Sequence, residues 1–186
     1  MEDLASIDDL NNFSQLAIDP SDTAAAFLLK VASGMVRRYL QQDVTATFGD
    51  VEYCDPVAGG VLLSQLPVTA VTQVETTTDG VTWTVADPAS YVVSRRLGIV
   101  SARGWTGTPW PSDPESWRVT YSHGYDNVPD EIKGVVCSVA ARFYSTPSGI
   151  DMERTGQRQV KYSLEAAGLN AMERLILDGF RIPRVA

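Results

Sequence analysis

The residues with the most evident chemistry are the one histidine of the chain, His123, and its two cysteines, Cys54 and Cys137. A thiol beside an imidazole forms a nucleophile–base pair in some enzymes, but no spacing here groups the three residues. The two thiols also lack C-x-x-C spacing, so we interpret them as small buried hydrophobic residues. A single histidine excludes the zinc motifs that need two.

Carboxylates follow the histidine at Asp126, Asp130 and Glu131. They could form a cation site, but acids at the start of a helix explain the same residues, because negative charge is favourable there. The chain has no phosphate-binding Gly-x-x-x-x-Gly-Lys-Ser/Thr loop, no Gly-x-Gly-x-x-Gly and no Gly-x-Ser-x-Gly. We therefore expect no enzyme, no metal and no cofactor.

The segment 117–144 must position these side chains, and its pattern predicts a strand, a turn and a helix. Apolar and polar residues alternate up to Ser122, as in a half-buried strand. Gly124 permits a backbone angle closed to most residues, and Pro129 suits the first position of a helix. We interpret His123 as a structural residue of this turn.

Helical patterns precede the strands and return after them. The periodicity predicts helices at 6–17, 20–42, 129–144 and 163–178. It predicts strands at 45–48, 51–54, 61–63, 68–77, 81–85, 91–94, 98–102, 117–122 and 158–162, with Asp79-Gly80 as a hairpin turn and 150–157 irregular. The expected fold is α+β, a small bundle of about four helices with a β insertion between the second and third. We expect one domain, with the bundle at 1–42 and 128–180, the insertion at 43–127 and a flexible tail at 181–186.

The four tryptophans divide into two pairs. Trp83 and Trp117 lie in strand patterns, so we expect them to pack on a sheet. Trp105 and Trp110 lie in a Gly- and Pro-rich loop, where they either fold back on the sheet or contact a partner.

Charge is unevenly distributed along the chain. The net charge is −8, yet residues 1–94 carry 13 acids and 3 bases, and residues 95–186 carry 10 acids and 12 bases. No base lies between Arg38 and Arg95. This pattern serves solubility, or it lets acidic and mildly basic surfaces of neighbouring subunits meet. An acidic chain is a poor candidate for tight DNA binding. The sequence shows neither a membrane span nor a secretion signal, so we expect folding in a cytoplasm.

The order of motifs resembles a known family, the head–tail connector (adaptor) proteins of tailed bacteriophages. The matching features are the acidic first helix, Ala25-Ala-Phe-Leu-Leu-Lys-Val-Ala-Ser in the second, Leu66-Pro-Val-Thr-Ala-Val-Thr-Gln-Val, Val119-Thr-Tyr-Ser-His-Gly-Tyr, Glu153-Arg-Thr-Gly, Val160-Lys-Tyr-Ser and a last amphipathic helix. The Trp- and Pro-rich loop 103–116 is not part of that pattern.

The resemblance implies a structural virion protein that forms a ring of about twelve copies beneath the portal. Such a ring extends the DNA channel, where DNA passes without specific binding, and receives the next neck or tail component. The chain could be a monomer before it docks, and it would assemble in the cytoplasm of the bacterial host. By position in the family, the portal-docking residues are in the C-terminal part, at Arg174, Arg181, Ile182 and Arg184.

The acidic first half then has a candidate role. We expect Asp43, Glu52, Asp55 and Glu75 to face the channel, where negative charge would keep DNA from adhering. The alternative is another neck component, a stopper or a tail-completion protein. An enzyme of unrecognised type and a DNA-binding regulator are the remaining, less favoured alternatives.

Overall fold

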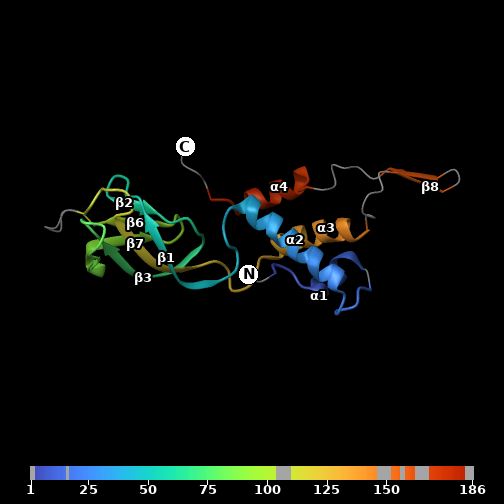
Figure 1. Cartoon of the computed structure of the whole chain (residues 1–186), viewed down its shortest axis with the longest axis horizontal. Helices are drawn as coiled ribbons and strands as arrows, with labels where there is room; N and C mark the ends of the chain where they lie inside the picture. The colour runs from blue at the N-terminus through green and yellow to red at the C-terminus, as the bar shows by residue number, and fades with distance from the viewer. Residues whose placement is uncertain are drawn as a thin grey trace. The chain divides into compact units, whose positions relative to one another are not determined.

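The structure is a computed structural model, and it describes residues 3–15, 17–103, 110–145, 152–155, 158–161 and 168–182. The chain divides into two compact units. The helical unit comprises Met1–Gln41 and Val128–Pro183. The described part of the β unit is Gln42–Asn127. Four helices and antiparallel sheets inserted between the second and third helices confirm the predicted α+β class (Figure 1).

The helical unit contains α1 (Ile7–Ser14), α2 (Thr23–Leu40), α3 (Asp130–Ser145) and α4 (Ala171–Asp178). Side chains cap three of these helices. Ser6 and Asp9 form a reciprocal capping box at α1, and the Asp22 carboxylate accepts from the N–H groups of Ala24 and Ala25 in the first turn of α2. Asn170 and Glu173 form a second capping box at α4. These polar residues fix where each helix begins.

The core of the helical unit is apolar and lies along α2 and α3, which pack on each other, with α1 on α3. The backbone N–H of Leu4 donates to the buried Ser33 hydroxyl at 3.0 Å, which holds the chain that precedes α1 against α2. The largest buried residues of this unit are Leu4, Leu10, Leu29, Val36, Ile132 and Leu177. Each such side chain contributes about 1.5–3 kcal/mol by leaving water.

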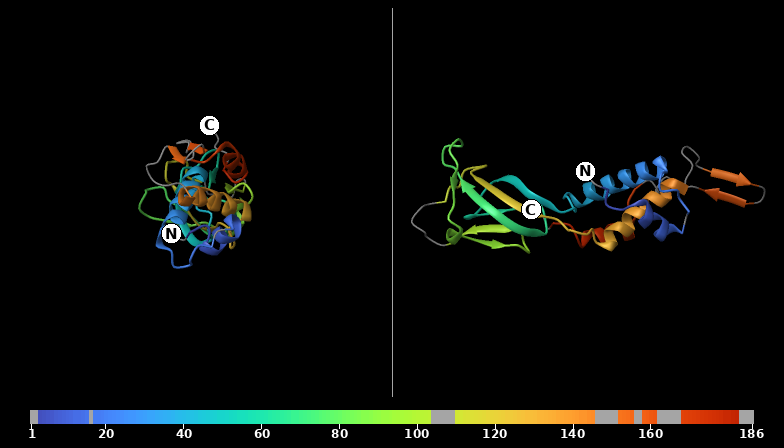
Figure 2. Two further views of the ribbon diagram at one scale, coloured as in Figure 1. Left: turned by 90° about the vertical axis from the view of Figure 1, so that its right-hand side faces the viewer. Right: turned by 90° about the horizontal axis from the view of Figure 1, so that it is seen from below.

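The β unit consists of two antiparallel sheets. The first has the order β1 (Thr47–Cys54), β7 (Trp117–His123), β3 (Val68–Thr76) and β4 (Thr84–Val85). The second has the order β2 (Gly60–Leu62), β6 (Ile99–Ala102) and β5 (Tyr91–Ser94), and a short 3₁₀ turn, η1 (Pro88–Ser90), precedes β5. Figure 2 shows the two layers of strands from a second direction.

Both sheets contribute to one core. Trp117, Val119 and Tyr121 alternate along the central strand β7 and have no exposed surface. They share a cluster with Val74 of β3 and Val100 of β6. Successive strand residues face opposite sides of a sheet. The alternation of apolar and polar residues that predicts this strand therefore matches the burial of every second side chain from Trp117 to Tyr121.

The last two strands, β8 (Met152–Thr155) and β9 (Arg158–Lys161), form a two-stranded sheet of their own. Met152 pairs with Lys161 and Thr155 with Arg158. Segment 150–157 was expected to be irregular, and β8 corrects that expectation. A short polar strand held by its partner's backbone carries no burial pattern for sequence reasoning to find.

Three further boundaries differ from the predictions. The strands expected at 45–48 and 51–54 are one strand with an irregularity at Gly49, whose φ is +67°. Asp79-Gly80 does not form a two-residue hairpin, because the Asp79 carboxylate accepts from the N–H groups of Val81 and Thr82 and so builds a wider turn. The last helix, expected from Ser163, is α4, which begins at Ala171 after the Asn170 cap. Ser163 itself lies outside the described residues.

Candidate functional site

The turn after β7 brings the end of the strand against the first residues of the β unit. His123 is buried, and its Nε2 lies 3.3 Å from an Asp50 carboxylate oxygen. Its ring also lies 5.2 Å from that of Tyr121. Within the described part of the chain, its Nδ1 has no hydrogen-bond partner. These contacts hold the ring in place between strands.

The backbone of Gly124 lies very close to the backbone of Thr45. Its φ is +86°, and a Cβ at this position would lie 2.3 Å from the Thr45 carbonyl oxygen. Its N–H donates to the Pro67 carbonyl at 3.0 Å, and the next residue, Tyr125, donates to Val44 at 2.9 Å. Only glycine fits this backbone approach without strain.

Pro129 directly precedes α3, and its carbonyl accepts from the N–H groups of Ile132 and Lys133. Asp130 and Glu131 occupy the first turn of that helix, where the helix dipole favours acids. Among the described residues, no group of three or more potential ligands could hold a metal ion.

Cys54 is not arranged for nucleophilic chemistry with His123. Cys54 pairs with Trp117, at the other end of β7 from His123, a separation of about 20 Å along a strand. Burial raises the pKa of Cys54 to about 12 and that of Cys137 to about 11, so both thiols stay protonated at neutral pH.

The four acids expected to face the channel lie in different environments. Asp55 is exposed and accepts from the Glu115 N–H at 2.8 Å, and Asp43 is half-buried. Glu52 accepts from the Tyr121 hydroxyl at 2.6 Å and from the Ser64 N–H. Burial, with the Glu52 hydrogen bond second, raises the pKa of Tyr121 far above its usual range.

Glu75 is buried in a fork-shaped ion pair with Arg118, with both N···O distances at 2.7 Å. The hydrogen bond from Arg118 is the main reason that the pKa of Glu75 is lowered. The guanidinium also lies 4.5 Å from the centre of the Trp83 ring, which Tyr53 meets edge-on. Trp83 therefore packs over a charged pair and outside a strand, which corrects its expected strand position.

Of the loop tryptophans, Trp110 folds back on the β unit. Its ring centre lies 4.4 Å from that of Trp117 and 6.5 Å from that of Tyr91. The Trp117 Nε1–H donates to the Pro111 carbonyl at 3.0 Å. Trp105 lies outside the described residues.

The helix α4 is fixed on one side and apolar on the other. Glu173 is buried, where it accepts from Arg142 at 2.9 and 3.0 Å, from the Ser138 hydroxyl at 2.8 Å and from the Asn170 N–H at 2.9 Å. Burial acts to raise the pKa of Glu173, but these donors outweigh it, and the net shift is downward. Sequence reasoning missed this anchor, although the Asn-x-x-Glu capping pattern was a signal for it.

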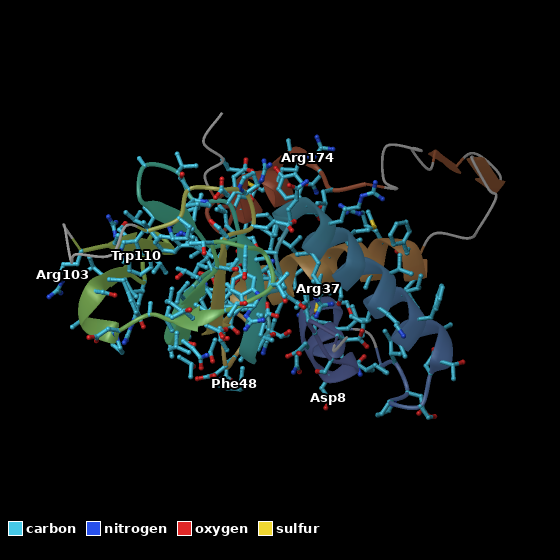
Figure 3. The ribbon with its side chains drawn as sticks, turned by 60° about the vertical axis from the view of Figure 1, so that its left-hand side comes forward. Asp8, Arg37, Phe48, Arg103, Trp110 and Arg174 are labelled. Atoms are coloured by element: carbon cyan, nitrogen blue, oxygen red, sulfur yellow. The ribbon has the colours of Figure 1, made fainter. Side chains whose placement is uncertain are left out.

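The outer side of α4 carries solvent-exposed apolar residues. Met172 is 66% exposed and Leu175 is 69% exposed. Arg174, which lies between them in the sequence, is exposed as well (Figure 3). Beyond the helix, Arg181 lies over the Tyr39 ring at 5.0 Å, and the Tyr39 hydroxyl donates to Asp178 at 2.7 Å. Two more residues are expected in the docking region. Ile182 is half-buried, and Arg184 lies outside the described residues.

None of the described helices has the length and apolar character needed to span a bilayer.

Comparison with known proteins identifies the class. The model of the head completion protein family matches residues 3–182, and the chain therefore belongs to that family. The family is structural and not enzymatic. Among curated proteins, no sequence matches this chain.

Solved structures share the fold. A chain from "Neck of empty GTA particle computed with C6 symmetry" superposes with a TM-score of 0.59 and 17% identity, covering 98% of this chain and 92% of that one. A chain from "Neck of native GTA particle computed with C12 symmetry" gives 0.58 and 14%, covering 100% and 96%. A chain from "Virion of native gene transfer agent (GTA) particle" gives 0.56 and 14%, covering 98% and 92%.

Proposed function

We propose that this head completion protein is the head-to-tail connector, or adaptor, of a tailed phage or phage-like particle. Copies form a ring beneath the portal, extend the DNA channel and join the capsid to the tail. The observation that carries the proposal is the family match over residues 3–182. The full-length fold match to chains of a neck computed with C12 symmetry supports it. The protein would reside in the neck of the virion.

The outer face of α4 is the portal-docking surface in this proposal. A helix on a protein surface normally buries its apolar residues, and α4 already buries Leu177. Met172 and Leu175 form a second apolar surface, which favours a protein partner. Arg174 and Arg181 add positive charge beside it, and arginine is enriched at such interfaces.

The channel is proposed to be lined by the β unit. Residues 43–94 hold seven acids and no base, so this surface repels phosphates. Asp55 contributes most because it is exposed, with Asp43 and Glu52 partly covered. Glu75 contributes least because Arg118 neutralises it. Reversal of Asp43 and Asp55 to lysine should create DNA binding that weakens steeply with salt.

The direct test is assembly with portal protein, measured by light scattering and electron microscopy. We expect the 20.2 kDa chain to form a ring on the portal, and we expect Leu175→Asp to abolish binding. Phe13→Asp is the control, because Phe13 is also exposed (52%) but lies on α1. A wild-type chain that fails to bind portal at any salt concentration refutes the proposal. A location one layer further from the portal in the particle identifies a stopper or tail-completion protein instead.

A further inference from the structure

The β8–β9 hairpin has no larger sheet to belong to. Its strands pair with each other, and in the part of the chain that the structure describes they join neither sheet of the β unit (Figure 2). An isolated two-stranded hairpin is at best marginally stable in water. A partner surface that accepts a strand would stabilise it.

The hairpin is basic, in a chain that is acidic overall. Residues 152–161 contain Arg154, Arg158 and Lys161 against one acid, Glu153. The net charge of this segment is therefore +2. A complementary surface should present backbone hydrogen-bonding groups and carboxylates together.

Strand β1 presents such a surface. It is an edge strand that pairs only with β7, and it is eight residues long. On its free edge the Val51 N–H is taken by the Asp50 carboxylate at 2.9 Å, where a neighbouring strand would otherwise supply an acceptor. Asp50 and Glu52 lie in the strand, and no base lies in 47–54.

The exposed side of β1 is also apolar. Phe48 is 78% exposed, Val51 is 47% exposed and Tyr53 is 54% exposed. A long edge strand with exposed apolar residues readily pairs with another chain. Beside the second half of β1, a groove of about 470 Å³ runs between this strand and the other edge strand, β2.

The remaining edges fit the hairpin less well. β4 has two residues, β2 has three and β5 has four. β5 also carries no acid within Tyr91–Ser94. Only β1 combines length with negative charge among the edges described.

We propose that the β8–β9 hairpin of one copy adds to the β1 edge of the neighbouring copy. This inference rests on the proposed function, because it describes how copies join in the ring. A ring needs two different, complementary patches on each subunit, and a basic hairpin and an acidic edge supply them. Strand addition gives main-chain hydrogen bonds, and the charges set the correct partner.

Cross-linking of the assembled protein tests this contact. The variant Val51→Cys/Gln159→Cys places one thiol on β1 and one on β9, and a short bis-maleimide would bridge them. The native thiols, Cys54 and Cys137, are buried and serve as silent background. We expect a ladder of covalent dimers, trimers and larger species in a denaturing gel.

The matched control is Val92→Cys/Gln159→Cys. Val92 is 45% exposed, close to the 47% of Val51, and it lies on the acid-free edge strand β5. We expect no ladder from this variant. A ladder of equal yield from Val92 overturns the inference, as does a product of monomer mass alone from Val51.

A charge variant tests the hairpin by a second route. Arg154→Glu/Arg158→Glu should keep the wild-type circular dichroism spectrum and lose the ring, with a fall in mass to 20.2 kDa. Rings that form unchanged overturn the inference and leave the proposed function intact. If wild-type protein does not assemble with portal, both fall.

Discussion

The anchor of α4 gives a quantitative prediction. Arg142→Met removes the cation from the buried Glu173 carboxylate, which then keeps only the Ser138 hydroxyl and the Asn170 N–H as donors. Breaking a buried pair in this way is costly, because a charge remains without its counter-ion. We expect a loss of about 3 kcal/mol in the free energy of unfolding.

The matched variant is Glu173→Gln. Its amide oxygen can still accept from Asn170, and Arg142 is 26% exposed and can be hydrated. We expect a loss of only about 1 kcal/mol. The double variant should be close to Glu173→Gln alone, because no buried charge remains, so the double-mutant cycle should give a coupling of about 3 kcal/mol.

The chain offers a separate optical probe for each unit. All four tryptophans lie between residues 83 and 117, in the β unit, whereas the four α-helices lie in the helical unit. Urea unfolding of Arg142→Met should shift the circular dichroism transition at 222 nm and leave the tryptophan fluorescence transition less affected. Equal, small losses in Arg142→Met and Glu173→Gln would refute the reasoning.

Three further predictions concern other parts of the molecule. Gly124→Ala should destabilise the β unit by at least about 2 kcal/mol, from the left-handed φ and the overlap with a backbone carbonyl, seen as an earlier tryptophan transition. The pKa of Glu75 is lowered in the folded chain, so its stabilising contribution is complete above its usual value of 4.5 and is lost as pH falls below it; a midpoint that rises on acidification contradicts this. Cys54 and Cys137 should resist a thiol reagent at pH 8 until urea unfolds the chain.

Much of the fold was predictable because burial leaves a period in the sequence. The alternation around Trp117, Val119 and Tyr121 reports a strand with one face in the core, and the apolar stripe that includes Ile132 and Val136 reports α3. The α+β class follows from the order of these patterns.

The rest depends on polar contacts between residues far apart in the chain. No local pattern predicts that Arg142 reaches Glu173, or that Arg118 and Trp83 stack beside Glu75. Strand β8 is polar and pairs with β9 through backbone hydrogen bonds, which leave no apolar pattern in the sequence. The docking residues expected from position stay a prediction, and sequence periodicity alone does not show that α4 exposes Met172 and Leu175.

The two ends of the β unit lie side by side. Thr45, near its beginning, bridges Tyr125, near its end, and Ala46 donates to the Tyr125 carbonyl at 3.0 Å. Because its two ends are close together, the inserted segment connects α2 to α3 as a short loop would. Protein chains tolerate insertions of this kind well. We therefore expect that the β unit can be shortened or replaced in this chain while the helical unit keeps its fold, as circular dichroism at 222 nm would show.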